Sequence, residues 1–231
     1  MEKELNMIAH MDPKSPLVEA YRMLRTNLQF SQVDNKLQTI AITSSTPNEG
    51  KSTVITNLAI VLAQAGNSVV VIDCDFRNPM QHKNFKCSNR RGFSNCIANH
   101  EDIFACVQKT QVDNVHVITG GPVPPNPSEL LGSKQVRGML DSLKGRYDYV
   151  LIDTPPIMPV TDAAIIGAKA DGLILVVEYG AIAPDLLKEA KERLTSPSIN
   201  LLGAVLSKVE VSSGRGYGYG YYHYYGKEDT K

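Results

Sequence analysis

Residues 37–53 read LQTIAITSSTPNEGKST: a β-rich run, a polar loop and the first residues of a helical stretch. The helical pattern continues to residue 64, and Gly66, a residue type that often follows helices, comes soon after. The loop from Ser45 to Thr53 fits the phosphate-binding loop, except that Ser45 stands where the first glycine is usual. Gly-Lys-Ser also occurs by chance in turns, but its position between a strand and a helix favours a phosphate site.

The loop supplies the groups that a nucleoside triphosphate needs. Backbone N–H groups and the positive end of the following helix can hold phosphates. Lys51 can reach the β and γ oxygens, and the Ser52 hydroxyl can bind Mg²⁺. We therefore expect ATP and Mg²⁺ to be bound by Pro47, Asn48, Glu49, Gly50, Lys51, Ser52 and Thr53.

Strand-like and helix-like segments alternate along the rest of the chain. The apolar runs VVVID (69–73) and YVLID (149–153) have the length and composition of strands that are buried on both faces of a parallel sheet. The alternation predicts an α/β fold of the P-loop NTPase kind, with a doubly wound, mainly parallel sheet and helices on both faces. Further strands are expected at 37–44, 115–119, 172–177 and 201–206, and helices at 133–144, 161–169 and 185–194.

Aspartates stand at the carboxyl ends of two of these strands. YVLID ends in Asp153 and is followed by Thr-Pro-Pro, which is the place for a Walker B carboxylate that holds the Mg²⁺ shell. VVVID ends in Asp73, and Asp75 follows two residues later, on the same side if the strand continues. One such aspartate alone is as often a turn or helix-cap residue, but three beside a phosphate loop indicate a metal and acid–base cluster.

Composition excludes several classes of protein. The 231 residues carry a formal net charge of zero, so no overall field attracts the chain to nucleic acid or anionic lipid. No apolar run approaches the roughly 20 residues that cross a bilayer, and the polar start MEKELN is not a signal peptide. We expect a cytoplasmic protein.

The four cysteines are spaced by 13, 9 and 10 residues, which matches no zinc or redox motif. They are Cys74, Cys87, Cys96 and Cys106. We expect reduced thiols, with Cys96 and Cys106 packed on helices.

Tyrosines are concentrated near the end of the chain: Tyr217, Tyr219, Tyr221, Tyr222, Tyr224 and Tyr225. The glycines between them and the charged ending KEDTK predict a domain in residues 1–210 followed by a disordered, exposed tail at 211–231. Such a tail could also be a sticky low-complexity segment, an aggregation-prone strand or a stacking platform for bases. Arg215 is the only basic side chain of the Lys/Arg type between residues 214 and 226, which argues against nucleic acid. Beside a nucleotide site, the six tyrosines indicate phosphoacceptors.

Together these motifs resemble the bacterial tyrosine kinases of capsular and exopolysaccharide biosynthesis, from about Ser15 to the tail. The likeness rests on the phosphate loop, IDCDFRNP (72–79), GGPVPPNPSELL (120–131), IDTPP (152–156) and the tyrosine cluster. A phosphate loop is shared by very many NTPases, whereas GPVPPNPSELL with IDTPP and a tyrosine tail is specific. The resemblance implies a protein tyrosine kinase that phosphorylates its own tail and regulates polysaccharide synthesis and export.

The resemblance also implies roles for single residues. Lys51 and Ser52 would bind phosphates and Mg²⁺, and Arg77 would lie near the transferring phosphate. A tyrosine hydroxyl would attack the γ-phosphate of MgATP in line, with an aspartate, Asp73 before the others, accepting the proton. The catalytic and metal set is then Lys51, Ser52, Asp73, Asp75, Arg77 and Asp153.

Two positions depart from the family pattern. Asn48 stands where many members have glycine, which leaves the loop geometry there open. Ser207 stands where relatives commonly place an asparagine that reads adenine, and a serine could make only part of that contact.

The segment EAYRMLR (19–25) fits the family's E-x-x-R-x-x-R motif. From the residues alone, Glu19, Arg22 and Arg25 lie on one stripe of a helix at about 15–30 and form a solvated ion-pair face. The resemblance implies that this stripe meets the next subunit in a ring, with an octamer as the suggested size. A ring of this kind would bring one subunit's tail to its neighbour's site.

Family members are either fused to a transmembrane polysaccharide co-polymerase or activated by the cytoplasmic segment of a separate one. This chain resembles the separate, Gram-positive type. The resemblance implies an activator that recruits the protein to the inner face of the membrane, and a cognate phosphotyrosine phosphatase; no nucleic-acid partner is expected.

Two alternatives remain. A partitioning or division-site ATPase shares the fold and the deviant loop, but carries an additional lysine early in the loop, where this chain has Thr46, and lacks a tyrosine tail. A non-catalytic, nucleotide-bound interaction module would have no reason to keep Lys51, Ser52 and the three aspartates.

Overall fold

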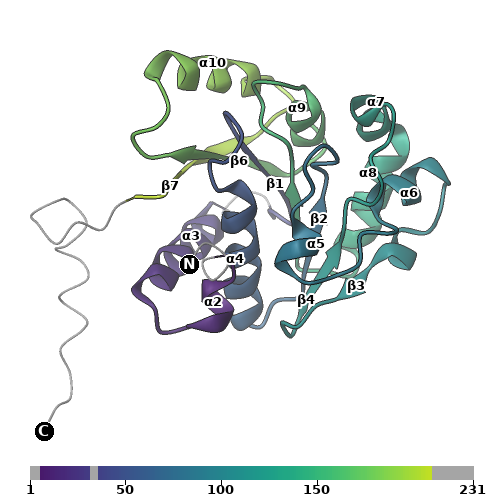
Figure 1. Ribbon diagram of the computed structural model, residues 1–231, viewed down its shortest axis with the longest axis horizontal. Coiled ribbons are helices and arrows are strands. Elements are labelled where there is room, and N and C mark those ends of the chain that lie inside the picture. Colours follow the sequence, from purple (N-terminus) through teal and green to yellow (C-terminus); the bar gives the residue numbers. More distant parts are fainter. Residues whose placement is uncertain (1–5, 32–35, 210–231) are drawn as a thin grey trace, which may run out of the picture.

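The computed structural model describes residues 6–31 and 36–209, whose centre is a seven-stranded sheet in the order β3-β4-β2-β5-β1-β6-β7 (Figure 1). The strands run parallel, except that the short edge strand β3 is antiparallel to β4. The strands are β1 (Thr39–Ser44), β2 (Val69–Asp73), β3 (Gln108–Lys109), β4 (Val115–Ile118), β5 (Tyr149–Asp153), β6 (Gly172–Glu178) and β7 (Leu201–Ser207).

The predicted fold class is confirmed, and each predicted strand and helix agrees with an observed element to within two residues at either end. Six shorter elements, of two to six residues each, were not predicted: α2, α5, α6, η1, β3 and α7. The helices are α2 (Ile8–Met11), α3 (Pro16–Phe30), α4 (Lys51–Gln64), α5 (Gln81–Asn84), α6 (Phe93–Ala98), the 3₁₀ helix η1 (Ile103–Cys106), α7 (Pro127–Gly132), α8 (Lys134–Lys144), α9 (Asp162–Gly167) and α10 (Pro184–Leu194).

Helices cover both faces of the sheet. Successive strand residues point to opposite faces, so Ile40 and Ile42 of β1 pack with α2, α3 and α4, while Ala41 between them packs toward α6, α8, α9 and α10. Every residue of β1, β2 and β5 is buried. The residues that follow these three central, parallel strands therefore lie at one protected edge of the sheet.

Helix α4 is buried on nearly all sides. Its inner face lies on the sheet, and its outer face is covered by α2 and α3 (Figure 1). The backbone N–H of Ala9 donates to Asn57 Oδ1 at 3.0 Å, and Gln64 Nε2 donates to the Ala9 carbonyl at 2.8 Å. This double cover explains why the helix carries apolar residues all round instead of a single stripe.

Asp171 fastens the beginning of β1. One carboxylate oxygen accepts the backbone N–H groups of Gln38 at 3.0 Å and Thr39 at 2.8 Å, and the other accepts Lys144 Nζ at 2.8 Å. Burial alone would raise the pKa of Asp171, but the hydrogen bonds from Lys144 and from Thr39 and Gln38 hold it below its ordinary value. The ionised form is therefore the one that the fold stabilises.

Replacing Asp171 by alanine is expected to lower the free energy of unfolding by about 2 kcal/mol, because hydrogen bonds to a charged group are lost. The contribution of a carboxylate with a depressed pKa is present above its unfolded pKa, near 3.8, and is lost as the pH falls through the lower folded value. Denaturant unfolding at pH 7 and below pH 4 measures both effects. Asp113→Ala, at an exposed position, is the control; an equal loss in both variants would contradict the assignment.

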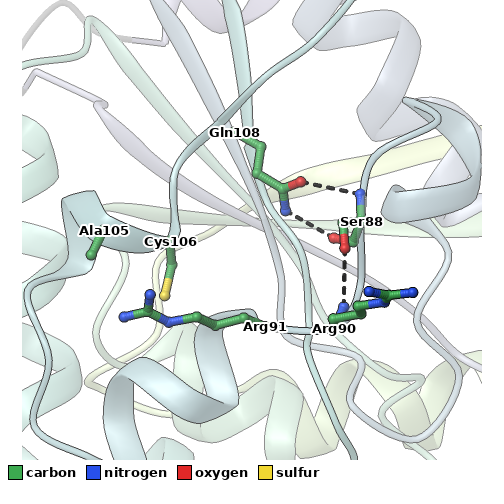
Figure 2. A pocket seen from close by; sticks show the side chains of 6 residues that line it. All are labelled: Ser88, Arg90, Arg91, Ala105, Cys106 and Gln108. Carbon is green, nitrogen blue, oxygen red and sulfur yellow. Dashed lines mark hydrogen bonds between the residues drawn. The ribbon is translucent and has the colours of Figure 1, made fainter.

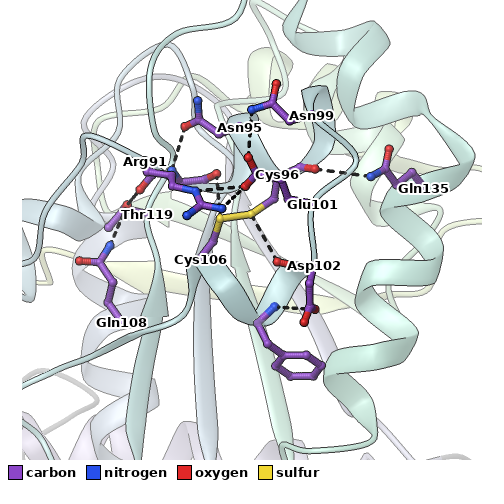
Figure 3. Close-up of a disulfide and its surroundings, with 12 residues drawn as sticks. Arg91, Asn95, Cys96, Asn99, Glu101, Asp102, Cys106, Gln108, Thr119 and Gln135 are labelled. Atoms are coloured by element: carbon purple, nitrogen blue, oxygen red, sulfur yellow. Dashed lines mark hydrogen bonds and ion pairs between the residues drawn. A yellow bond between two sulfur atoms is a disulfide. The ribbon is translucent and has the colours of Figure 1, made fainter.

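The expectation of four reduced thiols was wrong, because Cys96 and Cys106 form a disulfide (Figure 3). Cys74 and Cys87 are free. Cys96 lies in α6 and Cys106 in η1, and the chain reverses between them, where the Glu101 N–H donates to the Cys96 carbonyl at 3.0 Å. The spacing gave no signal because the pairing depends on that local reversal, which no motif encodes.

Among residues 6–31 and 36–209, no helix combines the length and the apolar character that a membrane span requires.

Candidate active site

The sheet register brings the predicted acidic residues together. Asp153, at the end of β5, is the neighbour of Asp73 at the end of β2 and of Ile42 in β1. The phosphate loop begins three residues beyond Ile42, so the loop and the two aspartates share the carboxyl edge of the sheet, which is where open α/β sheets bind ligands.

The phosphate loop turns through two left-handed residues. Asn48 has φ of 68° and Gly50 has φ of 89°, and Gly50 directly precedes α4. Asparagine is one of the few side chains that accept this conformation readily. The open question of Asn48 is thereby answered: it takes a backbone conformation that a glycine would also take.

Glu49 and Ser207 support the loop from within. The Glu49 carboxylate is buried; it accepts the backbone N–H and hydroxyl of Thr46 and the backbone N–H of Glu178. Ser207 Oγ donates to the Glu49 carbonyl, which ties the end of β7 to the loop. Glu49 therefore has its backbone, and not its carboxylate, to offer to a phosphate.

Lys51 lies between two carboxylates. Its Nζ is 2.9 Å from Asp75 Oδ2 and 3.1 Å from Asp153 Oδ1, and it reaches Ser52 Oγ at 3.3 Å. Burial alone would lower the pKa of Lys51, but the charges of Asp153 and Asp75 outweigh it and raise the pKa above its ordinary value. The ammonium group is thus charged and held at the start of α4.

Asp73 is fully buried beside this pair. Its Oδ2 accepts the backbone N–H groups of Met80 and Gln81 at 2.9 Å each, whereas within the described part of the chain Oδ1 accepts only the N–H of Asp75, at the longer distance of 3.2 Å. Burial, and then the charge of Asp153, raise the pKa of Asp73 to about 8. Oδ1 is therefore the less committed oxygen of a carboxylate that readily takes up a proton.

Gln81 is a site residue that the sequence analysis missed. Its Nε2 donates to Asp153 Oδ2 at 2.7 Å, and its Oε1 accepts the Thr56 hydroxyl at 3.0 Å. The side chain is fully buried and holds the carboxylate oxygen that Lys51 does not contact. No spacing rule links a glutamine eight residues after a strand to a metal shell, so no signal could have revealed it.

Asp162 connects two of the motifs, through Arg77 and Ser128. Arg77 Nε lies 3.5 Å from Oδ2 of the fully buried Asp162, whose Oδ1 accepts the Ser128 hydroxyl. A cavity of about 270 Å³ lies beside them, lined by Arg77 and the segment 125–129. The segment GPVPPNPSELL, on which the family resemblance partly rests, therefore forms a wall of this cavity, whereas Asp162 was not predicted.

The predicted stripe lies in α3, but its two arginines make different contacts. It consists of Glu19, Arg22 and Arg25. Arg22 pairs with Glu19 at the surface, and its Nη2 donates to the Pro13 carbonyl at 2.9 Å. Arg25 instead turns toward α4 and donates to the Val61 carbonyl at 2.9 Å. The six tail tyrosines lie outside the described residues.

Comparison with known proteins gives the family. The model of the AAA domain family matches residues 37–194. The tyrosine-protein kinase YwqD of Bacillus subtilis is 41% identical over 90% of this chain and 87% of its own length. The tyrosine-protein kinase CpsD of Streptococcus agalactiae is 40% identical over 92% of this chain and 91% of its own length. This chain belongs to the bacterial tyrosine-protein kinases.

Solved structures agree with this family. The chimerical protein CapA2B2 matches the kinase with a TM-score of 0.83 and 38% identity, over 87% of this chain and 88% of that one. The kinase domain of the Escherichia coli tyrosine kinase ETK matches with a TM-score of 0.82 and 34% identity, over 91% of this chain and 84% of that one. The septum site-determining protein MinD of Pyrococcus horikoshii shares the fold at 23% identity and a TM-score of 0.62. The kinase therefore has its fold in common with this septum site-determining protein.

Proposed function

We propose that this kinase transfers the γ-phosphate of ATP to tyrosines of its own C-terminal cluster and thereby regulates capsular or extracellular polysaccharide synthesis and export. The observation that carries the proposal is the position of Lys51, held by Asp75 and Asp153 where the phosphate loop meets α4. A division-site ATPase shares this fold but has no use for a cluster of tyrosines.

The loop from Pro47 to Thr53 binds the phosphates of ATP in this proposal. Its backbone faces the start of α4, whose unpaired N–H groups favour anions. When ATP binds, the ammonium group of Lys51 contacts phosphate oxygens instead of the Asp75 and Asp153 carboxylates. Asp75 and Asp153 are then free for another cation.

The donor set at this edge fits Mg²⁺, which prefers carboxylate and hydroxyl oxygens. Asp73, Asp75 and Asp153 with the Ser52 hydroxyl would hold it, and Gln81 keeps the Asp153 carboxylate oriented. When bound, Mg²⁺ neutralises charge on the β and γ oxygens.

Asp73 accepts the proton of the attacking tyrosine. A phenol with a pKa near 10 needs a base to lose its proton at neutral pH. Oδ2 of Asp73 is anchored by two backbone N–H groups, which leaves Oδ1 to face the incoming hydroxyl. Arg77, held at Asp162, lies two residues beyond Asp75 and would contact the transferring phosphate.

The acceptors are Tyr217, Tyr219, Tyr221, Tyr222, Tyr224 and Tyr225. We further propose that subunits assemble into a ring through Glu19 and Arg22, with Arg25 bracing α3 on α4, so that each tail reaches a neighbour's site. The cytoplasmic segment of a transmembrane co-polymerase would activate the kinase and recruit it to the inner face of the membrane. A cognate phosphatase would reverse the modification.

Intact mass after incubation with MgATP, with and without an activator segment, tests this function. We expect stepwise additions of one phosphate that map to Tyr217 through Tyr225. Replacing all six tyrosines by phenylalanine should remove the additions, because only the acceptor hydroxyls are lost and the fold of residues 6–209 is unchanged. Conversion of ATP to ADP with an unmodified tail would instead identify a division-site type of ATPase.

A further inference from the structure

A second cavity, of about 220 Å³, lies beside the disulfide, and none of its lining residues belongs to the candidate active site. Its walls come from the loop before α6, from η1 and from β3 (Figure 2). The lining residues are Ser88, Arg90, Arg91, Ala105, Cys106 and Gln108.

Only one sulfur of the disulfide belongs to this cavity. Cys106 is 4% exposed and part of the wall, whereas Cys96 is 0% exposed and does not line it. Figures 2 and 3 both show the guanidinium group of Arg91 next to the Cys106 sulfur. A small molecule that entered the cavity would therefore meet the disulfide at Cys106.

The cavity carries a net positive charge. The Arg91 guanidinium is paired with Glu101, whose carboxylate lies within 4.8 Å of both sulfur atoms. Arg90 is exposed, and its guanidinium has no acceptor among residues 6–31 and 36–209. Arg90 thus remains free to attract an anion, whereas the charge of Arg91 is balanced by Glu101.

We propose that this cavity is a site of thiol–disulfide exchange, in which a small, carboxylate-bearing thiol attacks the disulfide at Cys106. The sulfur of the incoming thiolate bonds to Cys106 Sγ, the Cys96–Cys106 bond breaks, and Cys96 leaves as a thiolate and takes up a proton. A second thiolate releases Cys106 from the mixed disulfide. Two small thiols are oxidised to one disulfide while the protein gains two thiols, and the reverse reaction closes the bond.

The disulfide is connected to the kinase site through Gly92. Cys106 Sγ lies 3.5 Å from the Gly92 carbonyl. The next N–H groups, of Phe93 and Ser94, donate to the carbonyls of Thr119 and Gly120 at 2.8 and 3.0 Å. Gly92 packs so tightly there that an added Cβ would stand 2.1 Å from the Thr119 oxygen.

The same segment borders the acidic motif. The centres of the Phe93 and Phe76 rings lie 6.3 Å apart. Phe76 stands between Asp75 and Arg77 in the chain. A Cβ on Gly120 would meet the Asp73 carbonyl oxygen at 3.5 Å. Opening the disulfide loosens the start of α6 and, through these contacts, the segment that carries Asp73, Asp75 and Arg77.

The first test compares disulfide opening by reduced glutathione, an anion, with opening by cysteamine, a cation, in the Cys87→Ser background. After correction for thiolate fraction, we expect several-fold faster opening by glutathione, measured by alkylation and intact mass. Arg90→Gln should remove the preference, and Lys188→Gln, at an exposed position in α10, should keep it. Equal rates for both thiols in the unaltered cavity would overturn the proposal.

The second test traps the mixed disulfide with oxidised glutathione. The Cys87→Ser/Cys96→Ser variant should gain one glutathionyl group at Cys106, while Cys87→Ser/Cys106→Ser should gain none at the buried Cys96. Modification of Cys96 in preference to Cys106 would contradict the assigned direction of attack. Thermal unfolding of each variant shows that the comparison concerns folded protein.

The regulatory consequence rests on the proposed kinase function and has its own readout. The reduced full chain should autophosphorylate several-fold more slowly than the oxidised chain, and Cys87→Ser should keep that difference. Because the two exchange tests use no ATP, they stand whether or not the tail is phosphorylated. Normal exchange with unchanged kinase activity would reject the coupling through Gly92.

Discussion

The Lys51→Met variant is expected to lose phosphate transfer to the tail by at least about 10²-fold, because a charge that stabilises the transferring phosphate disappears. The structure adds a second expectation. Lys51 neutralises the buried Asp75 and Asp153, so its removal should also lower the free energy of unfolding by about 3–5 kcal/mol, as when one partner of a buried ion pair is removed. Denaturant unfolding and phosphotyrosine detection measure the two losses separately.

A charge-matched control separates these effects. Lys51→Met/Asp75→Asn removes one cation and one anion, so it should recover part of the lost stability without recovering activity. If the double variant is no more stable than Lys51→Met, the ion pairs do not carry the stability. If Lys51→Met still phosphorylates its tail at the unaltered rate, the phosphate loop is not the catalytic site.

The Asp73→Asn variant is expected to lower kcat for tail phosphorylation by about 10²–10⁴-fold, the usual contribution of a general base. An amide oxygen can still accept a backbone N–H of Met80 or Gln81, but it cannot take up the tyrosine proton. Because burial and the charge of Asp153 already favour the neutral form of Asp73, its amide replaces a side chain of similar charge, so stability should fall less than in Lys51→Met. Single-turnover phosphorylation and thermal unfolding provide the measurements.

Asp75→Asn is the matched comparison for Asp73. Asp75 pairs with Lys51 directly, so its amide variant should weaken Mg²⁺ binding and the contact with Lys51. It should slow the proton transfer less than Asp73→Asn does. A larger loss of kcat at saturating MgATP in Asp75→Asn than in Asp73→Asn would assign the base to Asp75 instead.

Local sequence patterns were enough for the scaffold. Strand composition, the strand–loop–helix setting of residues 37–64 and the alternation after it predicted every long element, because burial on both faces of a parallel sheet leaves a readable apolar run. Parallel strands end at the same edge of a sheet. The sequence therefore also predicted that Asp73 and Asp153 lie at one edge.

The contacts made by Gln81 and Asp162 could not be read in this way. Gln81 opens a four-residue helix and reaches Asp153 across 72 positions of sequence, and Asp162 meets Ser128 across 34. Arg25 carries the family motif yet turns onto α4, because the neighbouring Val61 carbonyl is available to it. These contacts depend on how loops and helix ends approach one another.

The chain's own order of residues thus determined the α/β fold and the acidic edge, and it predicted the phosphate loop and the kinase family. Folding in three dimensions decided the Cys96–Cys106 bond, the ion pairs of Lys51 and the connection from Gly92 to the acidic motif. The physical reason is the distance along the sequence over which each effect acts. Periodicity and propensity act over a few neighbouring residues. Pairing of buried charges and sulfurs requires distant residues to approach one another, which only the packed sheet and its loops bring about.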